Sequence, residues 1–464
     1  MDFRPTELQR IAGKAVQQDY CPGIAKLAEG GFNKVFILRG RNGREVIARI
    51  PTPIAGPPHY TTASEVATMG FLRTVLKLPV PKVLTYSAAL DNPVGAEYIL
   101  MERVEGESLS SRWLSLTSDE VKDVMTQIAQ MERKIFDYRF PAYGSLYYKK
   151  ELDGETQIPT TDDFVIGPVS ARQFWHDERS TTPIDRVSPV DCVTAAARRE
   201  MAVIQQHAKA QPRQTFLLPT GHDLHPFEHS SLLAQSLQLA PRLITPGSSS
   251  APTLRHPDLS LGNILLALGS TKSTSIIDWQ DAVIFPRFMQ AGYPAFCEHN
   301  YSQPQSLTIP SLPDNFDDKD IDEQRQCRAM FRLEEANLYY TAATGVHNDQ
   351  HMEDLKLPHL GMLQYLLRQT GYPWDGDVIN LRAALVGITT PSWNESEQLL
   401  SRIREHLGID LEGGTEPENF EWAVEGNRQF RTEMVRQAEP GQRELCWRDW
   451  PYKDKDDDSL PSEM

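Results

Sequence analysis

Cysteine is scarce in this chain of 464 residues, and the five cysteines, Cys21, Cys192, Cys297, Cys327 and Cys446, lie far apart. No two of them form a Cys-x-x-Cys pair, so the sequence offers neither the usual spacing of a zinc site nor a disulfide framework. An odd number of widely separated thiols is typical of a reducing compartment. We therefore expect an intracellular protein with free cysteines.

Long apolar runs and basic clusters are also missing. No stretch approaches the roughly eighteen apolar residues of a membrane-spanning helix, so we expect no membrane insertion. The chain has 47 lysines and arginines against 63 aspartates and glutamates, a net charge of −16. Without a basic run, we expect no nucleic-acid partner, because binding to polyphosphate depends on clustered positive charge.

Residues 1–7 lack the apolar core of a signal peptide and contain acids that are atypical of a mitochondrial transit peptide.

Three polar side chains stand out in residues 256–280. Asp258 and Asn263 are five residues apart in a loop that leads into the apolar run 264–266, and Asp278 ends a second short apolar run. A polar turn joins the two runs, which predicts a hairpin with all three side chains gathered at one end.

Two carboxylates and one carboxamide in this arrangement suit phosphoryl transfer from a magnesium nucleotide. The reaction needs a carboxylate that orients the attacking hydroxyl and accepts its proton, and we assign this role to Asp258. It also needs hard oxygen ligands for Mg²⁺, and we assign these to Asn263 and Asp278. The alternative is that the three are ordinary turn and strand-end residues with no shared task, since Asp and Asn are common turn formers.

These segments resemble a known family. His-Pro-Asp-Leu-x-x-x-Asn-Ile-Leu at 256–265, followed by Ile-Ile-Asp-Trp-Gln at 276–280, is similar to the catalytic and metal-binding loops of the aminoglycoside phosphotransferase family, within the protein-kinase-like fold. Further segments are similar to the fungal "altered inheritance of mitochondria" subgroup of that family. They are residues 27–36, 46–51, 56–65, 164–168 and 252–258.

The resemblance implies an α+β, two-lobed protein-kinase-like fold. Residues 1–104 would form a small lobe on a five-stranded antiparallel sheet, and residues 105–445 a larger, mostly helical lobe with an insertion at about 150–220. Residues 446–464 would be an unstructured acidic tail. The implied activity is transfer of the γ-phosphoryl group of ATP, with Mg²⁺, to a hydroxyl of a small molecule. The implied location is the mitochondrion.

Gly30, Gly31 and Asn33 lie in the turn of a hairpin predicted near the N-terminus. Glycines allow backbone N–H groups to approach phosphates, and Asn tolerates the tight geometry of such a turn, so we expect these residues to cover the nucleotide. Taken alone, a Gly-Gly pair is also an ordinary hairpin turn.

A kinase-like small lobe uses a basic residue on its third strand to grip the nucleotide phosphates, and a Glu on the next helix to hold that residue. Here the candidates are Arg49 and Glu65, with Glu65 in the first turn of a helix capped by Thr61 or Thr62. The broader family has Lys where this chain has Arg49, and a planar guanidinium does not grip phosphate as a compact ammonium does. The alternative is that Arg49 is an ordinary surface arginine.

Patterns also predict features of the larger lobe. Thr117 to Glu120 form a capping box that starts a helix, and residues 352–369 read as one further helix. His256 is expected to hydrogen-bond the loop backbone rather than to act as an acid or base. The Phe174-Trp175-His176 segment lies in the insertion, and we expect its histidine to be structural.

Two functions remain open. The first is an ATP- and Mg²⁺-dependent phosphotransferase with an alcohol group as acceptor. Ser260 stands where Ser/Thr protein kinases usually have Lys, and no Ala-Pro-Glu signature follows Asp278, so a small-molecule acceptor is favoured over a protein. The second is a pseudokinase-like binding protein that acts in mitochondrial maintenance, which Arg49 and the long insertion favour.

Overall fold

The computed structural model describes residues 3–152, 157–171, 188–212, 223–244, 247–298, 309–372, 374 and 378–389, with a few residues between 424 and 436. The chain divides into two units, Met1–Ala384 and Leu385–Met464, and the candidate site lies within the first. The segment 174–176, the boundary expected at 445 and the tail 446–464 lie outside the described residues. Among the described helices, none is both long and apolar enough to cross a membrane.

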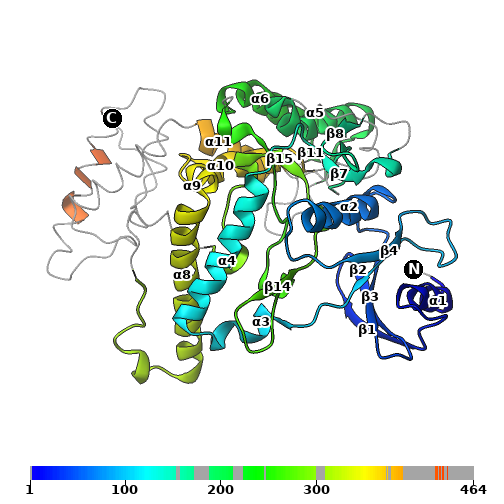
Figure 1. The fold of residues 1–464 in the computed structure, drawn as a ribbon. Coiled ribbons are helices and arrows are strands. Elements are labelled where there is room, and N and C mark those ends of the chain that lie inside the picture. The colour runs from blue at the N-terminus through cyan, green and yellow to red at the C-terminus, as the bar shows by residue number, and fades with distance from the viewer. Residues whose placement is uncertain are drawn as a thin grey trace. The chain divides into compact units, whose positions relative to one another are not determined.

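A five-stranded antiparallel sheet forms the N-terminal part of the first unit (Figure 1). Its strand order is β1-β2-β3-β5-β4, and neighbouring strands pair antiparallel throughout. The five-stranded antiparallel sheet expected for the small lobe is therefore confirmed. The strands are β1 (Gly23–Glu29), β2 (Asn33–Arg39), β3 (Glu45–Pro51), β4 (Val83–Ser87) and β5 (Tyr98–Glu102).

The two faces of this sheet pack against different helices. Ala48 and Ile50 of β3 join the core that the sheet forms with helix α1 (Pro5–Ala15). Because side chains alternate along a strand, Arg49 projects from the opposite face. There it reaches helix α2 (Tyr60–Thr74). The alternation of β3 therefore directs the basic side chain toward the helix that carries its predicted partner.

Helix α2 begins earlier than its sequence predicts. Its N-cap is His59, whose side chain makes no capping hydrogen bond, and Thr61 and Thr62 lie inside the helix. The predicted threonine cap is wrong because Glu97 accepts the Thr62 hydroxyl at 2.5 Å and the His59 backbone N–H at 2.7 Å. Glu65 consequently lies in the second turn of α2 instead of the first.

The predicted hairpin after the catalytic loop is present. It consists of β13 (Ile264–Leu266) and β14 (Ser273–Ile276), and β6 (Glu107–Ser108) pairs with the other edge of β13. Helices α4 (Ser118–Phe136) and α8 (Ile321–His347) pack side by side in the larger lobe (Figure 1).

Both ends of the capping box at the start of α4 are hydrogen-bonded. The hydroxyl of Thr117 accepts from the backbone of Glu120, and the Glu120 side chain accepts from the backbone of Thr117. The prediction of a helix starting here is confirmed, because both partners lie within one turn of chain.

A second small sheet packs against α2. Its strands are β7 (Ser145–Tyr148), β9 (Phe164–Gly167) and β8 (Ile158–Pro159), in that order, and β7 packs against α2. The remaining helices and strands are α3 (Leu109–Arg112), α5 (Pro189–His207), β10 (Gln211–Pro212), β11 (Asp223–Leu224), α6 (Pro226–Leu243), β12 (Pro252–Leu254), β15 (Ile284–Pro286), α7 (Arg287–Gln290), α9 (Asp349–Leu355), α10 (Leu360–Gln369) and α11 (Ile379–Thr389).

The single helix expected at 352–369 is wrong, since α9 ends at Leu355 and α10 starts at Leu360. Pro358 lies between them. Proline has no N–H to donate and disfavours helical geometry in the residue before it, so the chain turns there and starts a new helix.

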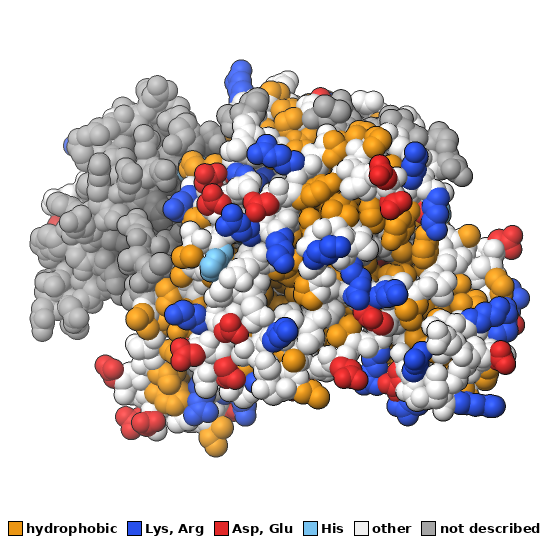
Figure 2. Space-filling view, in the orientation of Figure 1, with side chains coloured by type: hydrophobic (Ala, Val, Ile, Leu, Met, Phe, Trp, Pro, Cys, Tyr) orange, Lys and Arg blue, Asp and Glu red, His pale blue; other side chains and the backbone are white. Residues whose placement is uncertain are grey.

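Surface charge of both signs is spread over the described part of the chain. On the face shown in Figure 2, basic and acidic side chains alternate with apolar ones across the sheet and the helices. This face therefore carries no uniform field of one sign.

Candidate functional site

The guanidinium of Arg49 is the centre of the candidate site. The residue is 7% exposed, and its side chain forms an ion pair with Glu65 of α2. Its Nη2 also donates to Asp278 Oδ1 at 2.6 Å and to Gln280 Oε1 at 2.8 Å. The reading of Arg49 as an ordinary surface arginine is therefore wrong. One side chain joins the sheet, helix α2 and the loop after β14.

Negative charge exceeds positive charge around this guanidinium. Burial disfavours the charge of Arg49, but Glu65 and Asp278 outweigh burial and raise its pKa. Burial raises the pKa of Glu65 to about 7, and Asp278 and Asp281 add to the rise although Arg49 opposes it. Three carboxylates thus share one guanidinium, and this imbalance is what a bound divalent cation would offset.

Gln280 connects the glycine-containing hairpin to the same group. Its Oε1 accepts from Asn33 Nδ2 at 2.6 Å as well as from Arg49, and its Nε2 donates to the Ala55 carbonyl at 2.9 Å. We did not predict a site role for this residue. The available signal was its position two residues after Asp278, at the end of the Ile-Ile-Asp-Trp-Gln motif.

Gly30 and Gly31 form the exposed turn between β1 and β2, where the Gly30 N–H donates to the Asn33 carbonyl at 3.0 Å. A Cβ added to either glycine would meet no heavy atom within 4 Å. Packing within the protein therefore does not require glycine at these positions, and the space over the turn is open to a ligand.

His256 ties the loop of Asp258 to the strand end that precedes Asp278. Its Nδ1 accepts from the Asp258 backbone N–H at 3.1 Å, so its Nε2 carries the proton that it donates to the Ile277 carbonyl at 2.9 Å. The expected backbone role is confirmed. Burial lowers the pKa of His256 to about 4, which keeps the ring neutral near pH 7, and the two backbone hydrogen bonds fix its tautomer.

The three predicted side chains come from adjacent pieces of backbone. Asn263 Nδ2 donates to the Asp258 carbonyl at 2.8 Å, and the Asn263 carbonyl accepts from the Ile277 N–H at 3.0 Å. Asn263 therefore lies beside the residue that precedes Asp278. The carboxylates of Asp258 and Asp278 belong to exposed residues.

Asp278 and Asp281 adopt left-handed backbone conformations, with φ of +67° and +61°. Such conformations are uncommon for residues other than glycine, although Asp tolerates them better than most. They persist where the surrounding structure holds them, and they recur at functional sites. The turn directs the Asp278 carboxylate back toward Arg49, with which it pairs.

The donor set fits a hard cation such as Mg²⁺. Because Asn263 is anchored through its amide nitrogen, its oxygen would be the atom that faces a cation, and Asp278 could supply a carboxylate. In the part of the chain that the structure describes, no three His, Cys, Asp or Glu side chains converge into a complete metal site. A bound Mg²⁺ would thus take its other ligands from phosphate oxygens and water, as is usual for this ion.

Comparisons with known proteins identify the family of this chain. The model of the phosphotransferase enzyme family matches residues 23–292, more than half of the chain. The chain is 70% identical to the subtelomeric hrmA-associated cluster protein of Aspergillus fumigatus, over 96% of this chain and 99% of that protein. It is 24% identical to altered inheritance of mitochondria protein 9 of Lodderomyces elongisporus, over 78% of this chain and 62% of that protein.

Among solved structures, the streptomycin–ATP–APH(2")-IIa ternary complex is similar with a TM-score of 0.41 and 13% identity, over 84% of this chain and 97% of that chain. The ADP-bound aminoglycoside phosphotransferase APH(2'')-Ib has a TM-score of 0.42 and 12% identity, over 82% and 96%. The family match covers the sheet with Arg49, the catalytic loop and the hairpin that ends at Asp278. This chain, with its five-stranded antiparallel sheet, belongs to the phosphotransferase enzyme family.

Proposed function

We propose that this chain is an ATP- and Mg²⁺-dependent phosphotransferase that transfers the γ-phosphoryl group to a hydroxyl of a small molecule. The observation that carries the proposal is the convergence on Arg49. Arg49, the proposed phosphate-gripping cation, forms ion pairs both with Glu65 and with the predicted metal ligand Asp278. Family membership supports phosphoryl transfer as the reaction. A small molecule is proposed as the acceptor because Ser260 stands where Ser/Thr protein kinases usually have Lys.

Each predicted residue has a role that its surroundings permit. Asp258 is exposed, so an acceptor hydroxyl can reach its carboxylate, which would orient that hydroxyl and take its proton. Asn263 and Asp278 would hold Mg²⁺, which when bound neutralises charge on the phosphates. Arg49, held by Glu65, would contact the same phosphates.

The glycine-containing turn would close over the nucleotide. The space over Gly30 and Gly31 would admit the phosphates close to the backbone, and Asn33 is fixed through Gln280 to the loop of Asp278. Residues 1–104 would thus form the nucleotide-binding lobe, while residues 105–445 would hold the catalytic and metal loops and the acceptor. The names of the mitochondrial relatives support a mitochondrial location for this reaction.

A second candidate function is a binding protein with weak or no turnover, acting in mitochondrial maintenance. One observation favours it: Arg49 Nη2 already occupies Asp278 Oδ1 and Gln280 Oε1. A nucleotide–metal complex would have to draw Asp278 away from this guanidinium. Lysine, with a single nitrogen, would make fewer such contacts.

The two functions differ in whether ATP is consumed. We would incubate the protein with Mg²⁺–ATP and metabolite extracts, identify a phosphorylated acceptor, and measure single-turnover transfer to it. We expect Asp258→Asn to lower that rate by at least about a hundredfold while nucleotide affinity is kept, because the amide cannot accept the proton.

Asp91→Asn is the matched control, since Asp91 is exposed in a loop outside the site. It should leave the rate unchanged. Undiminished single-turnover transfer in Asp258→Asn would exclude its role as base. Nucleotide binding with no consumption in any extract would favour the binding protein.

A further inference from the structure

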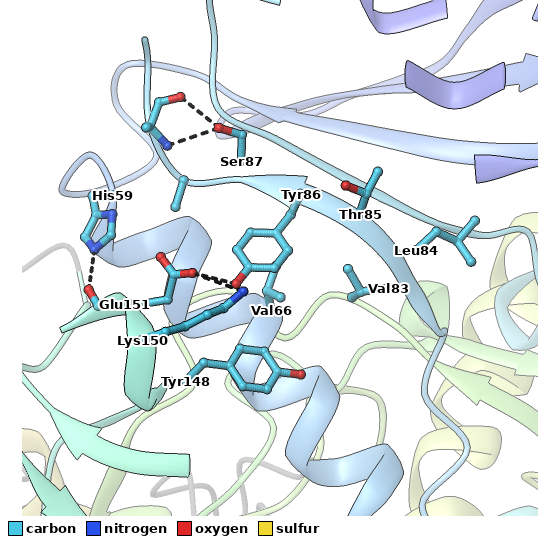
Figure 3. A pocket seen from close by; sticks show the side chains of 12 residues that line it. His59, Val66, Val83, Leu84, Thr85, Tyr86, Ser87, Tyr148, Lys150 and Glu151 are labelled. Carbon is cyan, nitrogen blue, oxygen red and sulfur yellow. Dashed lines mark hydrogen bonds and ion pairs between the residues drawn. The ribbon is translucent and has the colours of Figure 1, made fainter. Parts of the chain in front are cut away.

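A cavity of about 630 Å³ lies between helix α2, strand β4 and the segment that follows β7 (Figure 3). Val66 of α2 and Val83 and Tyr86 of β4 form part of its wall, and Tyr148 and Glu151 close it from the other side. None of the residues assigned to phosphoryl transfer lines it.

An ammonium group already sits in this cavity. Lys150 Nζ lies 5.2 Å from the centre of the Tyr86 ring and 5.9 Å from that of Tyr148. It is also 3.8 Å from Glu151 Oε1, which accepts from the Tyr86 hydroxyl at 2.6 Å. A cation within about 6 Å of an aromatic face is attracted by the ring. Two rings and one carboxylate therefore form a cage for a cation (Figure 3).

Lys150 is a weakly held occupant of this cage. Its side chain is 69% exposed, against 17% for Glu151. An exposed ion pair contributes little to stability, and a long flexible side chain loses entropy when it is held in place. An external ammonium that brings additional buried contacts can therefore displace it.

The surroundings of the cage favour positive charge. Burial raises the pKa of Tyr86, and its hydrogen bond to Glu151 and that carboxylate's charge raise it further. Burial likewise raises the pKa of Tyr148, with an additional contribution from Asp163. Both phenols therefore stay neutral, and the Glu151 carboxylate supplies the negative charge next to Lys150 Nζ.

The cavity is much larger than one ammonium needs, and its volume is in the range of small-molecule sites. Away from the cage, the wall has an apolar and a polar part. Val66 on α2 and Val83 and Ala88 on and after β4 form the apolar part, and His59, Thr85 and Ser87 form the polar part. A fitting ligand thus has an apolar body beside its charged group.

We propose that this cavity is a second ligand site, which binds an amphipathic organic amine. The ammonium of the ligand replaces that of Lys150 between Tyr86, Tyr148 and Glu151, and its apolar body packs on α2 and β4. The site is separate from the proposed phosphotransfer centre and does not depend on that activity.

Isothermal titration calorimetry of the full chain tests the proposal with three probes of similar size: phenethylamine, which is cationic, 2-phenylethanol, which is neutral, and 3-phenylpropionate, which is anionic. We expect phenethylamine to bind at least about tenfold more tightly than the other two. Lys150→Met removes the tethered competitor, so it should strengthen phenethylamine binding by about three- to tenfold. Glu151→Gln should weaken it by a similar factor.

Lys149→Met is the matched control, because Lys149 is an exposed neighbour that does not line the cavity. It should leave all three affinities unchanged. If Glu151→Gln does not fold, Lys150→Met still decides the question, since it alters an exposed side chain. Tightest binding of 3-phenylpropionate, with its loss in Lys150→Met, would overturn the proposal. So would equal binding of all three probes, or no binding of phenethylamine to Lys150→Met.

Discussion

The guanidinium of Arg49 makes contacts that a lysine at the same position could not make together. Its planar fork donates to Glu65, Asp278 and Gln280, and its Nε is buried without a partner in the described structure. A lysine ammonium has its three donors on a single nitrogen, so it could not span these acceptors as the separate Nη1 and Nη2 do. Arg49 therefore connects the five-stranded sheet to the loop of Asp278 and Gln280.

His256 makes a pH-dependent contribution to the stability of the folded chain. Its pKa is about 4 in the folded protein and about 6.5 in an unfolded chain, because burial disfavours the charged ring. This contribution of His256 to the free energy of unfolding is fully present above pH 6.5 and is lost as the pH falls toward 4. Between pH 7.5 and pH 5 the free energy of unfolding should fall by about 2 kcal/mol from this residue, as measured by urea unfolding.

His256→Asn removes the titrating group, so it should lower this pH dependence by about the same amount. His207→Asn, on an exposed residue at the end of α5, should keep the dependence of the natural chain. If His256→Asn and the natural chain lose stability equally on acidification, the neutral buried ring is not its source.

Among the elements, the short strand β6 fixes the linker between the lobes to the catalytic hairpin. Gly106 directly precedes β6 with φ of +153°, a region that residues with a Cβ rarely adopt. A Cβ there would lie 2.5 Å from the Leu266 carbonyl oxygen and 3.0 Å from Thr274 Oγ1. Close contact between the linker and this hairpin therefore requires glycine.

Gly106→Ala should lower the free energy of unfolding by about 2 kcal/mol or more, because strained backbone and a contact with a carbonyl add together. Gly345→Ala, at an exposed position inside α8 with only an ordinary contact nearby, should instead raise it by about 0.5–1 kcal/mol. Urea unfolding of both variants measures these two changes in the free energy of unfolding. Equal effects would show that the linker tolerates a side chain.

Helix α2 contributes side chains to both proposed ligand sites. Glu65 points to the guanidinium at the candidate site, and Val66 contributes to the cavity on the side of β4. The close approach of β7 is possible because α2 has a glycine, Gly70, at which a Cβ would lie 2.1 Å from the Tyr148 hydroxyl. One helix thus borders both proposed ligand sites.

Across the whole first unit, the small lobe and the metal loop meet through Arg49, Asn33 and Ala55, all of which contact the loop of Asp278 and Gln280. A ligand that binds these elements only in the folded chain stabilises that chain. Mg²⁺–ATP at about a hundred times its Kd should raise the free energy of unfolding by about 2.7 kcal/mol, visible as a higher Tm.

The magnesium dependence has its own controls. EDTA should reduce the shift in Tm, and Asp278→Asn should make the shift insensitive to Mg²⁺, whereas Asp258→Asn should keep it. The same shift with and without Mg²⁺ in the natural chain would contradict a metal at Asn263 and Asp278. No shift at all would count against nucleotide binding, whatever the acceptor.

The sequence by itself determined the features that depend on neighbouring residues. The capping box at Thr117, the hairpin after the catalytic loop and the side of β3 on which Arg49 lies follow from hydrogen bonds and alternation within a few positions. The pattern at 256–280 also indicated the family, whose model matches residues 23–292.

Only the tertiary structure determined which distant segments of the chain contact one another. Gln280 bonds to Asn33 across 247 positions, and Glu97 takes the hydroxyl that was expected to cap α2. The cavity beside Val66 exists because α2, β4 and the segment after β7 come together. Local propensity and periodicity depend on neighbours in the chain, whereas these contacts form only when folding brings remote groups within hydrogen-bond or packing distance.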